Sequence, residues 1–185
     1  MKRLRLISPL LVCLISAGLA GAAETPAIWI DVPFVTQTRD GCGPAVISMV
    51  MQYWAKQIGP SASSNMDPVK IQALLTSPGK ERITASAMEE YFQRAGYRTF
   101  AFRGEWNDLQ HHLSQGRPLI VSLKASGSHG PLHYAVVVGA DSVRGYVFLN
   151  DPAATKMLRI SREGFESEWS LASNWMLLAV PGAGN

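Results

Sequence analysis

The sequence predicts an α+β fold, with helices in the first half of the chain and a mostly antiparallel sheet in the second. Apolar residues recur at helical spacing in several segments between residues 44 and 113. From Pro118 onward, short apolar runs rich in Val, Ile and Leu are separated by turn residues. Asp141–Gly145 is typical of a hairpin turn between two such runs, which favours antiparallel pairing.

The N-terminus has the features of an export signal. Met1–Arg5 is basic, Leu6–Leu19 is apolar, and Ala20–Ala23 consists of small residues. We expect a cleaved signal peptide over residues 1–23, which would also remove Cys13. An uncleaved anchor is the alternative, although the apolar run is shorter than the roughly 20 residues that a membrane span needs.

The remaining 162 residues, 24–185, have the length of one domain, and we expect a single domain there. Removing Lys2, Arg3 and Arg5 lowers the net charge from +3 to zero, so the basicity belongs to the signal. No basic stripe indicates nucleic-acid binding. We therefore expect a monomeric periplasmic or secreted protein without a membrane span in its mature part.

The first helix is predicted over residues 44–54. Val46, Met49, Val50, Tyr53 and Trp54 recur at helical spacing. Other apolar residues occupy the remaining faces, so this helix should be buried on most sides.

Three further helices are predicted in the first half from their start signals. Asp67 and Pro68 supply a cap and a first helical residue. A capping box formed by Ser86 and Glu89 indicates the next helix. Trp106 begins the third, whose apolar residues share one face. A last short helix is expected over residues 165–169.

The strands are predicted from apolar runs bounded by Gly, Pro, Asn and Asp. An edge strand or extended segment should cover residues 28–35. The other strands should cover residues 97–102, 118–123, 133–139, 146–150, 157–160 and 175–180.

Cys42 is the one cysteine that remains after removal of the signal, and it is a candidate nucleophile. Gly41 and Gly43 permit a sharp turn, and Pro44 suits a first helical position. Cys42 should therefore lie at a helix N-terminus, where the dipole favours a thiolate. The alternative is a small buried hydrophobe, as most free cysteines are.

His133 is the candidate base, because it begins an apolar strand at the rim of the sheet. His129 is less suited, since it lies in a glycine-containing loop where a base would be poorly positioned. His111 and His112 lie among polar residues of a helix and are expected to be solvated.

Asp151 is the candidate acid that orients the imidazole. The hairpin at residues 141–145 should place the end of one strand beside the start of the other, and so Asp151 beside His133. Asn150 is the alternative orienting residue, and a simple Asp-Pro turn is the structural alternative.

Gln37 is the candidate oxyanion donor, together with the backbone N–H of Cys42. A solvated glutamine is the alternative. No metal-ligand spacing, phosphate loop or dinucleotide fingerprint occurs, so we expect neither a metal nor a cofactor.

Four motifs in this order resemble those of the bacteriocin-processing double-glycine peptidases, family thirty-nine of the cysteine peptidases. They are Val32-Pro33-Phe34 with Gln37 and Cys42-Gly43-Pro44-Ala45, Gly116 with Pro118-Leu119-Ile120-Val121, His133-Tyr134-Ala135-Val136-Val137-Val138-Gly139, and Asn150-Asp151-Pro152. The similarity extends over roughly Ile30 to Val180.

The resemblance implies a papain-like fold, with a central buried helix that carries the nucleophile and packs on a C-terminal sheet. It also implies a thiol peptidase that acts on a peptide or protein. In it Cys42 is the nucleophile, His133 the base, Asp151 the orienting acid and Gln37 the oxyanion donor. Because an export signal precedes these motifs and no transporter segment accompanies them, we expect a stand-alone exported member.

Two other functions remain open at this point. A periplasmic amidase or peptidoglycan-fragment hydrolase would use the same three residues. A peptide-binding module with a degenerate site would keep the fold without the chemistry.

Overall fold

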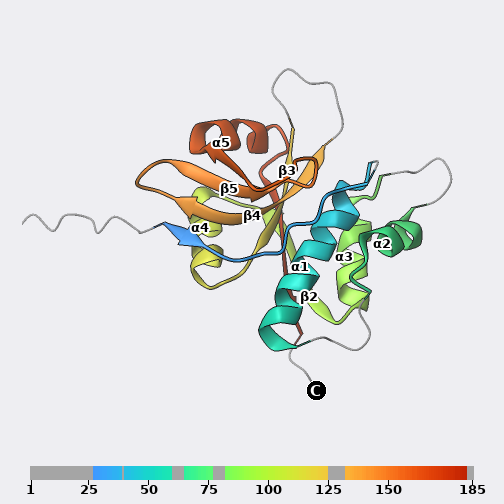
Figure 1. The fold of residues 1–185 in the computed structure, drawn as a ribbon. Coiled ribbons are helices and arrows are strands. Elements are labelled where there is room, and N and C mark those ends of the chain that lie inside the picture. Colours follow the sequence, from blue (N-terminus) through green and yellow to red (C-terminus); the bar gives the residue numbers. More distant parts are fainter. Residues whose placement is uncertain (1–26, 39, 60–64, 77–81, 125–131, 183–185) are drawn as a thin grey trace, which may run out of the picture.

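The computed structural model describes residues 27–38, 40–59, 65–76, 82–124 and 132–182. In this part of the chain, three helices, α1 (Cys42–Ile58), α2 (Pro68–Leu75) and α3 (Ala85–Arg94), lie together beside a sheet of seven antiparallel strands (Figure 1). This is the predicted α+β architecture, with a buried helix packed on the sheet. The predicted signal peptide lies outside the described residues, as does His129.

The sheet has the strand order β2-β7-β3-β4-β5-β6, and the short β1 pairs with β4. The strands are β1 (Ile28–Trp29), β2 (Tyr97–Arg103), β3 (Leu119–Leu123), β4 (His133–Asp141), β5 (Tyr146–Asn150), β6 (Leu158–Ser161) and β7 (Trp175–Pro181). β2, which lies between α3 and α4 (Trp106–Ser114) in sequence, pairs with β7 along its whole length and forms one edge of the sheet.

β4 is the strand around which the sheet is built. It pairs with β3 from His133 to Val137 and with β5 from Val136 to Asp141. All of its residues after His133 are buried, as its unbroken apolar sequence predicts. The β4–β5 connection is the predicted hairpin, in which Asp141 Oδ1 accepts a hydrogen bond of 2.9 Å from the backbone N–H of Arg144.

α1 (Cys42–Ile58) is the central buried helix. Every residue from Cys42 to Met51 is buried, which fits its apolar composition on all faces. The hydroxyl of Tyr53 donates to the carbonyl of Gly116 at 2.6 Å, and Trp54 Nε1 donates to the carbonyl of Ala179 in β7 at 2.9 Å. These two bonds fix the helix against the sheet.

The other helices are α2 (Pro68–Leu75), α3 (Ala85–Arg94), α4 (Trp106–Ser114) and α5 (Arg162–Ser170). Asp67 caps α2 as predicted, because its side chain accepts from the N–H of Val69. The predicted start of α3 is wrong. Thr84 is the N-cap, and its hydroxyl accepts from the N–H of Ala87, which places Ser86 inside the first turn.

The N-terminal segment pairs as a strand only at Ile28–Trp29, so the prediction of an edge strand over residues 28–35 holds for two residues. The N–H of Ile30 still donates to the carbonyl of Val138 at 2.9 Å. Pro33 has no N–H to continue a ladder, and residues 30–38 form neither a helix nor a strand.

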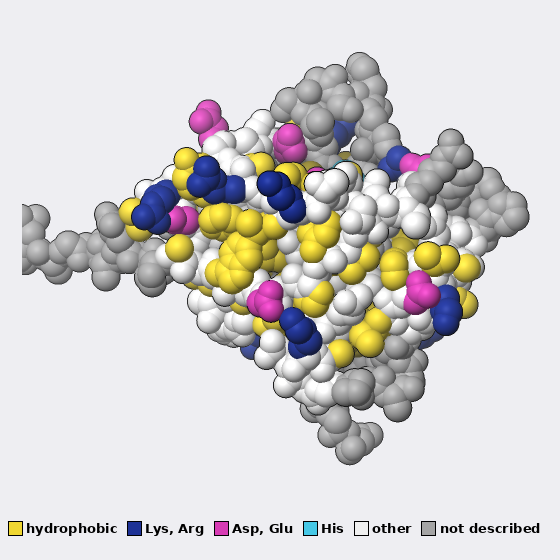
Figure 2. All heavy atoms as spheres, viewed as in Figure 1, with side chains coloured by type: hydrophobic (Ala, Val, Ile, Leu, Met, Phe, Trp, Pro, Cys, Tyr) yellow, Lys and Arg dark blue, Asp and Glu magenta, His cyan; other side chains and the backbone are white. Residues whose placement is uncertain are grey.

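On the face shown in Figure 2, basic and acidic side chains alternate with apolar ones, without a broad area of one charge sign. None of the helices in the described ranges is long and apolar enough to cross a membrane.

Candidate active site

Cys42 is the first residue of α1, and Gly41 is the N-cap, with no side-chain hydrogen bond to the cap. The thiol is therefore at the positive end of a helix of 17 residues, as its sequence context predicts. Pro44 is the third helical residue, not the first. The N–H of a third helical residue also has no partner within the helix, so proline is tolerated there. Cys42 is buried, with 6% of its surface exposed.

The glycines on either side of Cys42 are closely packed by neighbouring side chains. A Cβ atom on Gly43 would collide with the side chain of Ile83, which precedes α3. A Cβ atom on Gly41 would lie 2.8 Å from Gln72 Oε1 of α2. The first turn of α1 is thus in direct contact with residues that precede or belong to its neighbouring helices.

His133 and Asp151 meet at one end of the β4–β5 hairpin. Val136 is opposite Asn150 in the register, so the next pair would set Asp151 opposite Ala135. His133 then lies diagonally across from Asp151 on the same face, within reach of a side-chain contact. His133 Nε2 is 2.6 Å from Asp151 Oδ1.

The carboxylate of Asp151 is held by its own turn. The N–H of Ala153 donates to Asp151 Oδ1 at 2.8 Å, and the N–H of Ala154 donates to the Asp151 carbonyl at 3.0 Å. This Asx turn fixes the oxygen that meets His133.

The imidazole of His133 lies close enough to the thiol of Cys42 that a hydrogen bond and charge between them lower the pKa of the thiol and raise that of the imidazole. Because Nε2 faces Asp151, Nδ1 is the ring nitrogen left for the thiol. The structure therefore brings the three predicted residues together around the imidazole of His133.

Burial alone would raise the pKa of the Cys42 thiol, but other effects outweigh it and the pKa lies below its usual value. The His133 side chain and the backbone N–H of Tyr134 donate hydrogen bonds to the sulfur, and the charges of His133 and Arg82 favour the thiolate. For His133, burial lowers the pKa, but its contacts with Asp151 and Cys42 raise it to about 9.

Burial would also raise the pKa of Asp151, but the hydrogen bond and charge of His133 hold that pKa below its usual value. Together these directions favour an imidazolium between a thiolate and a carboxylate at neutral pH. Such a site can deliver a nucleophile and a proton from neighbouring atoms.

Gln37 approaches this site through its backbone. Its N–H donates to the carbonyl of Pro152 at 2.8 Å, directly after Asp151. Its Oε1 atom is buried and has no hydrogen-bond partner among the described residues.

The competing candidates lie elsewhere. The side chain of Asn150 donates to the carbonyl of Val32 at 2.9 Å, so it supports the N-terminal segment. His111 is exposed as predicted. His112 is half-buried against Phe102, with ring centroids 6.0 Å apart, which corrects the prediction of a solvated side chain.

Two groups that lower the pKa of the Cys42 thiol were not predicted from the sequence. The backbone N–H of Tyr134 carries no side-chain signal, although its position after His133 could have indicated it. Arg82 lies forty residues from Cys42 in sequence, and no motif indicates it. Within the described ranges, no group of His, Cys, Asp and Glu could hold a metal ion.

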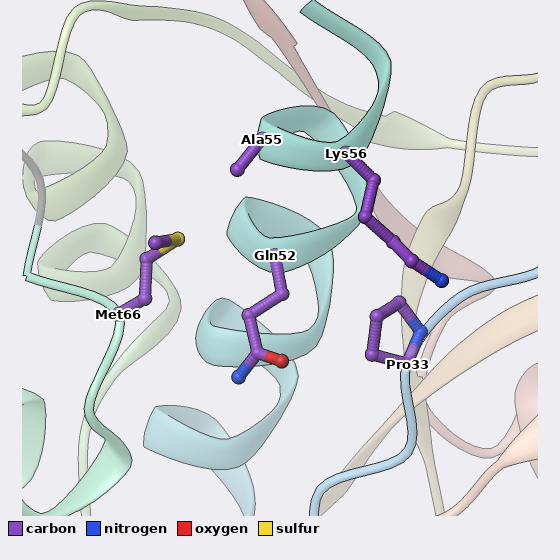
Figure 3. A pocket seen from close by; sticks show the side chains of 5 residues that line it. All are labelled: Pro33, Gln52, Ala55, Lys56 and Met66. Atoms are coloured by element: carbon purple, nitrogen blue, oxygen red, sulfur yellow. The ribbon is translucent and has the colours of Figure 1, made fainter. Parts of the chain in front are cut away.

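A separate pocket of about 490 Å³ lies along α1, and Figure 3 shows the residues that line it: Pro33, Gln52, Ala55, Lys56 and Met66. Cys42, His133 and Asp151 are not among the residues that line this pocket. The polar side chains in it are already engaged, since Gln52 bonds to Ser48 and Lys56 pairs with Asp31.

Comparison with solved structures gives many matches in fold, and three of them follow. The peptidase domain of Streptococcus ComA, a bifunctional ABC transporter of a quorum-sensing pathway, is 26% identical with a TM-score of 0.62, over 82% of this chain and 99% of that one. A putative C39-like peptidase from Bacillus anthracis is 16% identical with a TM-score of 0.64, over 86% of this chain and 100% of that one.

The third match is a double-glycine-motif protease from an AMS/PCAT transporter, solved in complex with a leader peptide. It is 19% identical with a TM-score of 0.59, over 83% of this chain and 94% of that one. No curated protein matches this chain at a significant level of similarity.

The Peptidase C39-like family matches residues 29–175, which include Cys42, His133 and Asp151. This match covers most of the chain and agrees with the papain-like α+β fold. The chain belongs to the Peptidase C39-like family and is a cysteine peptidase.

Proposed function

We propose that the chain hydrolyses peptide bonds through a Cys42–His133–Asp151 triad. One observation carries the proposal: His133 Nε2 lies 2.6 Å from Asp151 Oδ1, and the same imidazole lies close enough to the Cys42 thiol to lower its pKa. A nucleophile, a base and an orienting acid in this arrangement are the parts required for covalent acyl transfer.

In the first half-reaction, the Cys42 thiolate attacks the peptide carbonyl carbon, and the carbonyl π electrons move onto oxygen. The tetrahedral species then collapses, the C–N bond breaks, and the His133 imidazolium donates its proton to the leaving amine. A thioester on Cys42 remains, and His133 is neutral.

In the second half-reaction, a water molecule gives a proton to His133 and attacks the thioester. The C–S bond breaks, the carboxylic acid leaves, and the thiolate–imidazolium pair is restored. Asp151 keeps the imidazole oriented in both halves and stabilises its charged form.

We assign the oxyanion site to the backbone N–H of Cys42 and the side-chain amide of Gln37. The N–H of a first helical residue has no intrahelical partner, so it is free to donate. The bond from Gln37 to the Pro152 carbonyl supports this role, because it fixes Gln37 beside the turn that carries Asp151.

A peptide or protein is the proposed substrate. The similar transporter protease binds a leader peptide, which supports a peptide substrate for this chain as well. We further propose that residues 1–23 direct export and are removed, which leaves one domain from residue 24 onward that acts as a monomer in the periplasm or outside the cell. The basic start, apolar run and small residues support this proposal.

The direct test is hydrolysis of a peptide panel that includes Gly-Gly-containing peptides, followed by mass spectrometry. Cleavage should occur with the wild type and disappear in Cys42→Ala. His111→Ala is the matched control, because His111 is exposed on α4. Full turnover by Cys42→Ala would end the proposal. Release of products from murein fragments, with no peptide cleaved, would assign the chain to amidase chemistry instead.

A further inference from the structure

The segment just before α3 lies against the turn that carries Cys42. Ile83 packs on Gly43 so closely that no Cβ atom fits there. Next to it, a guanidinium nitrogen of Arg82 is 2.6 Å from Asp40 Oδ1, two residues before Cys42. The side chains of Arg82 and Asp40 are 46% and 29% exposed, so the pair lies at the surface of the site.

Asp40 has an unusual backbone conformation. Its φ is +55°, in the left-handed region that few residues other than glycine adopt. Such a conformation is strained and persists where neighbouring contacts hold it. The ion pair with Arg82 is one such contact. The bond from the Gly41 N–H to the Thr38 carbonyl, 3.0 Å, is another.

The conformation of Asp40 determines where Cys42 lies. Asp40 lies in a turn directly before Gly41 and the start of α1, so a rotation at Asp40 would move the first helical residue. The same Arg82 charge also favours the thiolate of Cys42. Arg82 thus affects Cys42 in two ways. Its ion pair with Asp40 holds the backbone before Cys42, and its charge lowers the pKa of the thiol.

We infer that Arg82 is a positioning residue for Cys42: through its ion pair with Asp40 it holds the turn that leads into α1. This inference rests on the proposed role of Cys42 as the nucleophile. Four charged or titratable groups face the sulfur or its turn: His133 and Tyr134 from β4, Arg82 from the segment before α3, and Asp40.

The variant Arg82→Gln removes the charge and keeps a polar side chain of similar length. Below neutral pH, Cys42 should react with iodoacetamide about two- to fivefold more slowly than in the wild type, the range for one partly exposed charge pair. The turnover number should fall by roughly tenfold with little change in KM, because the nucleophile is displaced and not the substrate.

Arg82→Lys and Arg94→Gln are the controls. Lysine keeps the charge, so Arg82→Lys should retain the wild-type alkylation profile. Its turnover number should lie between those of Arg82→Gln and the wild type. Arg94 pairs with Glu90 on an exposed face of α3, and Arg94→Gln should change neither quantity. Thermal melts of each variant establish that the fold is kept, and Arg82→Lys still tests the inference if Arg82→Gln is unstable.

An unchanged alkylation profile and turnover in Arg82→Gln would overturn the inference, and so would an effect on KM alone, which would make Arg82 a substrate contact. Either result would leave the proposed function intact, provided that the wild-type thiol reacts well below its ordinary pKa. An ordinary thiol in the wild type would instead count against the proposed function itself.

Discussion

His133 and Asp151 lie diagonally across the β4–β5 hairpin, with Nε2 of one 2.6 Å from Oδ1 of the other. The contact is set by backbone pairing, since the register at Val136 and Asn150 determines which side chains share this face. The orientation of the imidazole toward Cys42 is therefore built into the sheet.

Asp151→Asn should shift the pH dependence of kcat/KM. In the wild type, activity should fall as pH rises through about 9, because His133 then loses the proton that it gives to the leaving amine. Asparagine carries no charge, so the pKa of His133 should fall and the alkaline limb should move to lower pH. Peptide cleavage measured between pH 5 and pH 10 checks this.

Asp141→Asn is the matched control for that experiment. Asp141 lies at the other end of the same hairpin, where it accepts hydrogen bonds from Arg144. The control should keep the wild-type alkaline limb. The role assigned to Asp151 is contradicted if Asp151→Asn keeps the wild-type alkaline limb, or if Asp141→Asn shifts that limb by the same amount.

Gln37→Ala should lower kcat by about a hundredfold to a thousandfold, the usual cost of one oxyanion donor. The pH dependence of Cys42 alkylation should stay at the wild-type profile, because alkylation by iodoacetamide develops no oxyanion. Gln52→Ala, in the pocket along α1, is the control and should retain full activity. Wild-type turnover in Gln37→Ala would remove Gln37 from the mechanism.

Gly43→Ala should destabilise the protein by about 1–3 kcal/mol, the usual cost of an extra methyl group in a tightly packed position. The new Cβ atom would overlap Cγ1 and Cδ1 of Ile83. The double variant Gly43→Ala/Ile83→Ala should lose less stability than the sum of the two single variants, because the second change removes both overlapping atoms. Urea unfolding of the two single variants and the double variant gives the coupling free energy. Strict additivity would show that the overlap does not limit stability.

The sequence predicted the parts of the fold that depend on local patterns. The apolar faces of α1 indicated a buried helix, and the turn at Asp141–Gly145 indicated the hairpin that joins His133 to Asp151. Cys42 could be placed at a helix start because glycines and a proline surround it. Each of these features is encoded within about twenty residues.

Other features depend on contacts between distant residues and were not predictable in this way. Arg82 reaches Asp40 across the packing of α1 against the segment before α3, and no local pattern specifies that packing. The N-cap of α3 is Thr84 and not Ser86. Both residue types are good caps, so only the packed position of the helix decides between them. The half-buried His112 likewise depends on Phe102 from another element.

The most direct test of the central claim is the rate at which iodoacetamide alkylates Cys42 as a function of pH, in the wild type and in His133→Ala. The account predicts a rate that stays high well below the ordinary thiol pKa of about 8.5 and that drops at the same pH values in the variant. A rate that follows an ordinary thiol in both proteins would contradict the thiolate–imidazolium pair and, with it, the proposed triad.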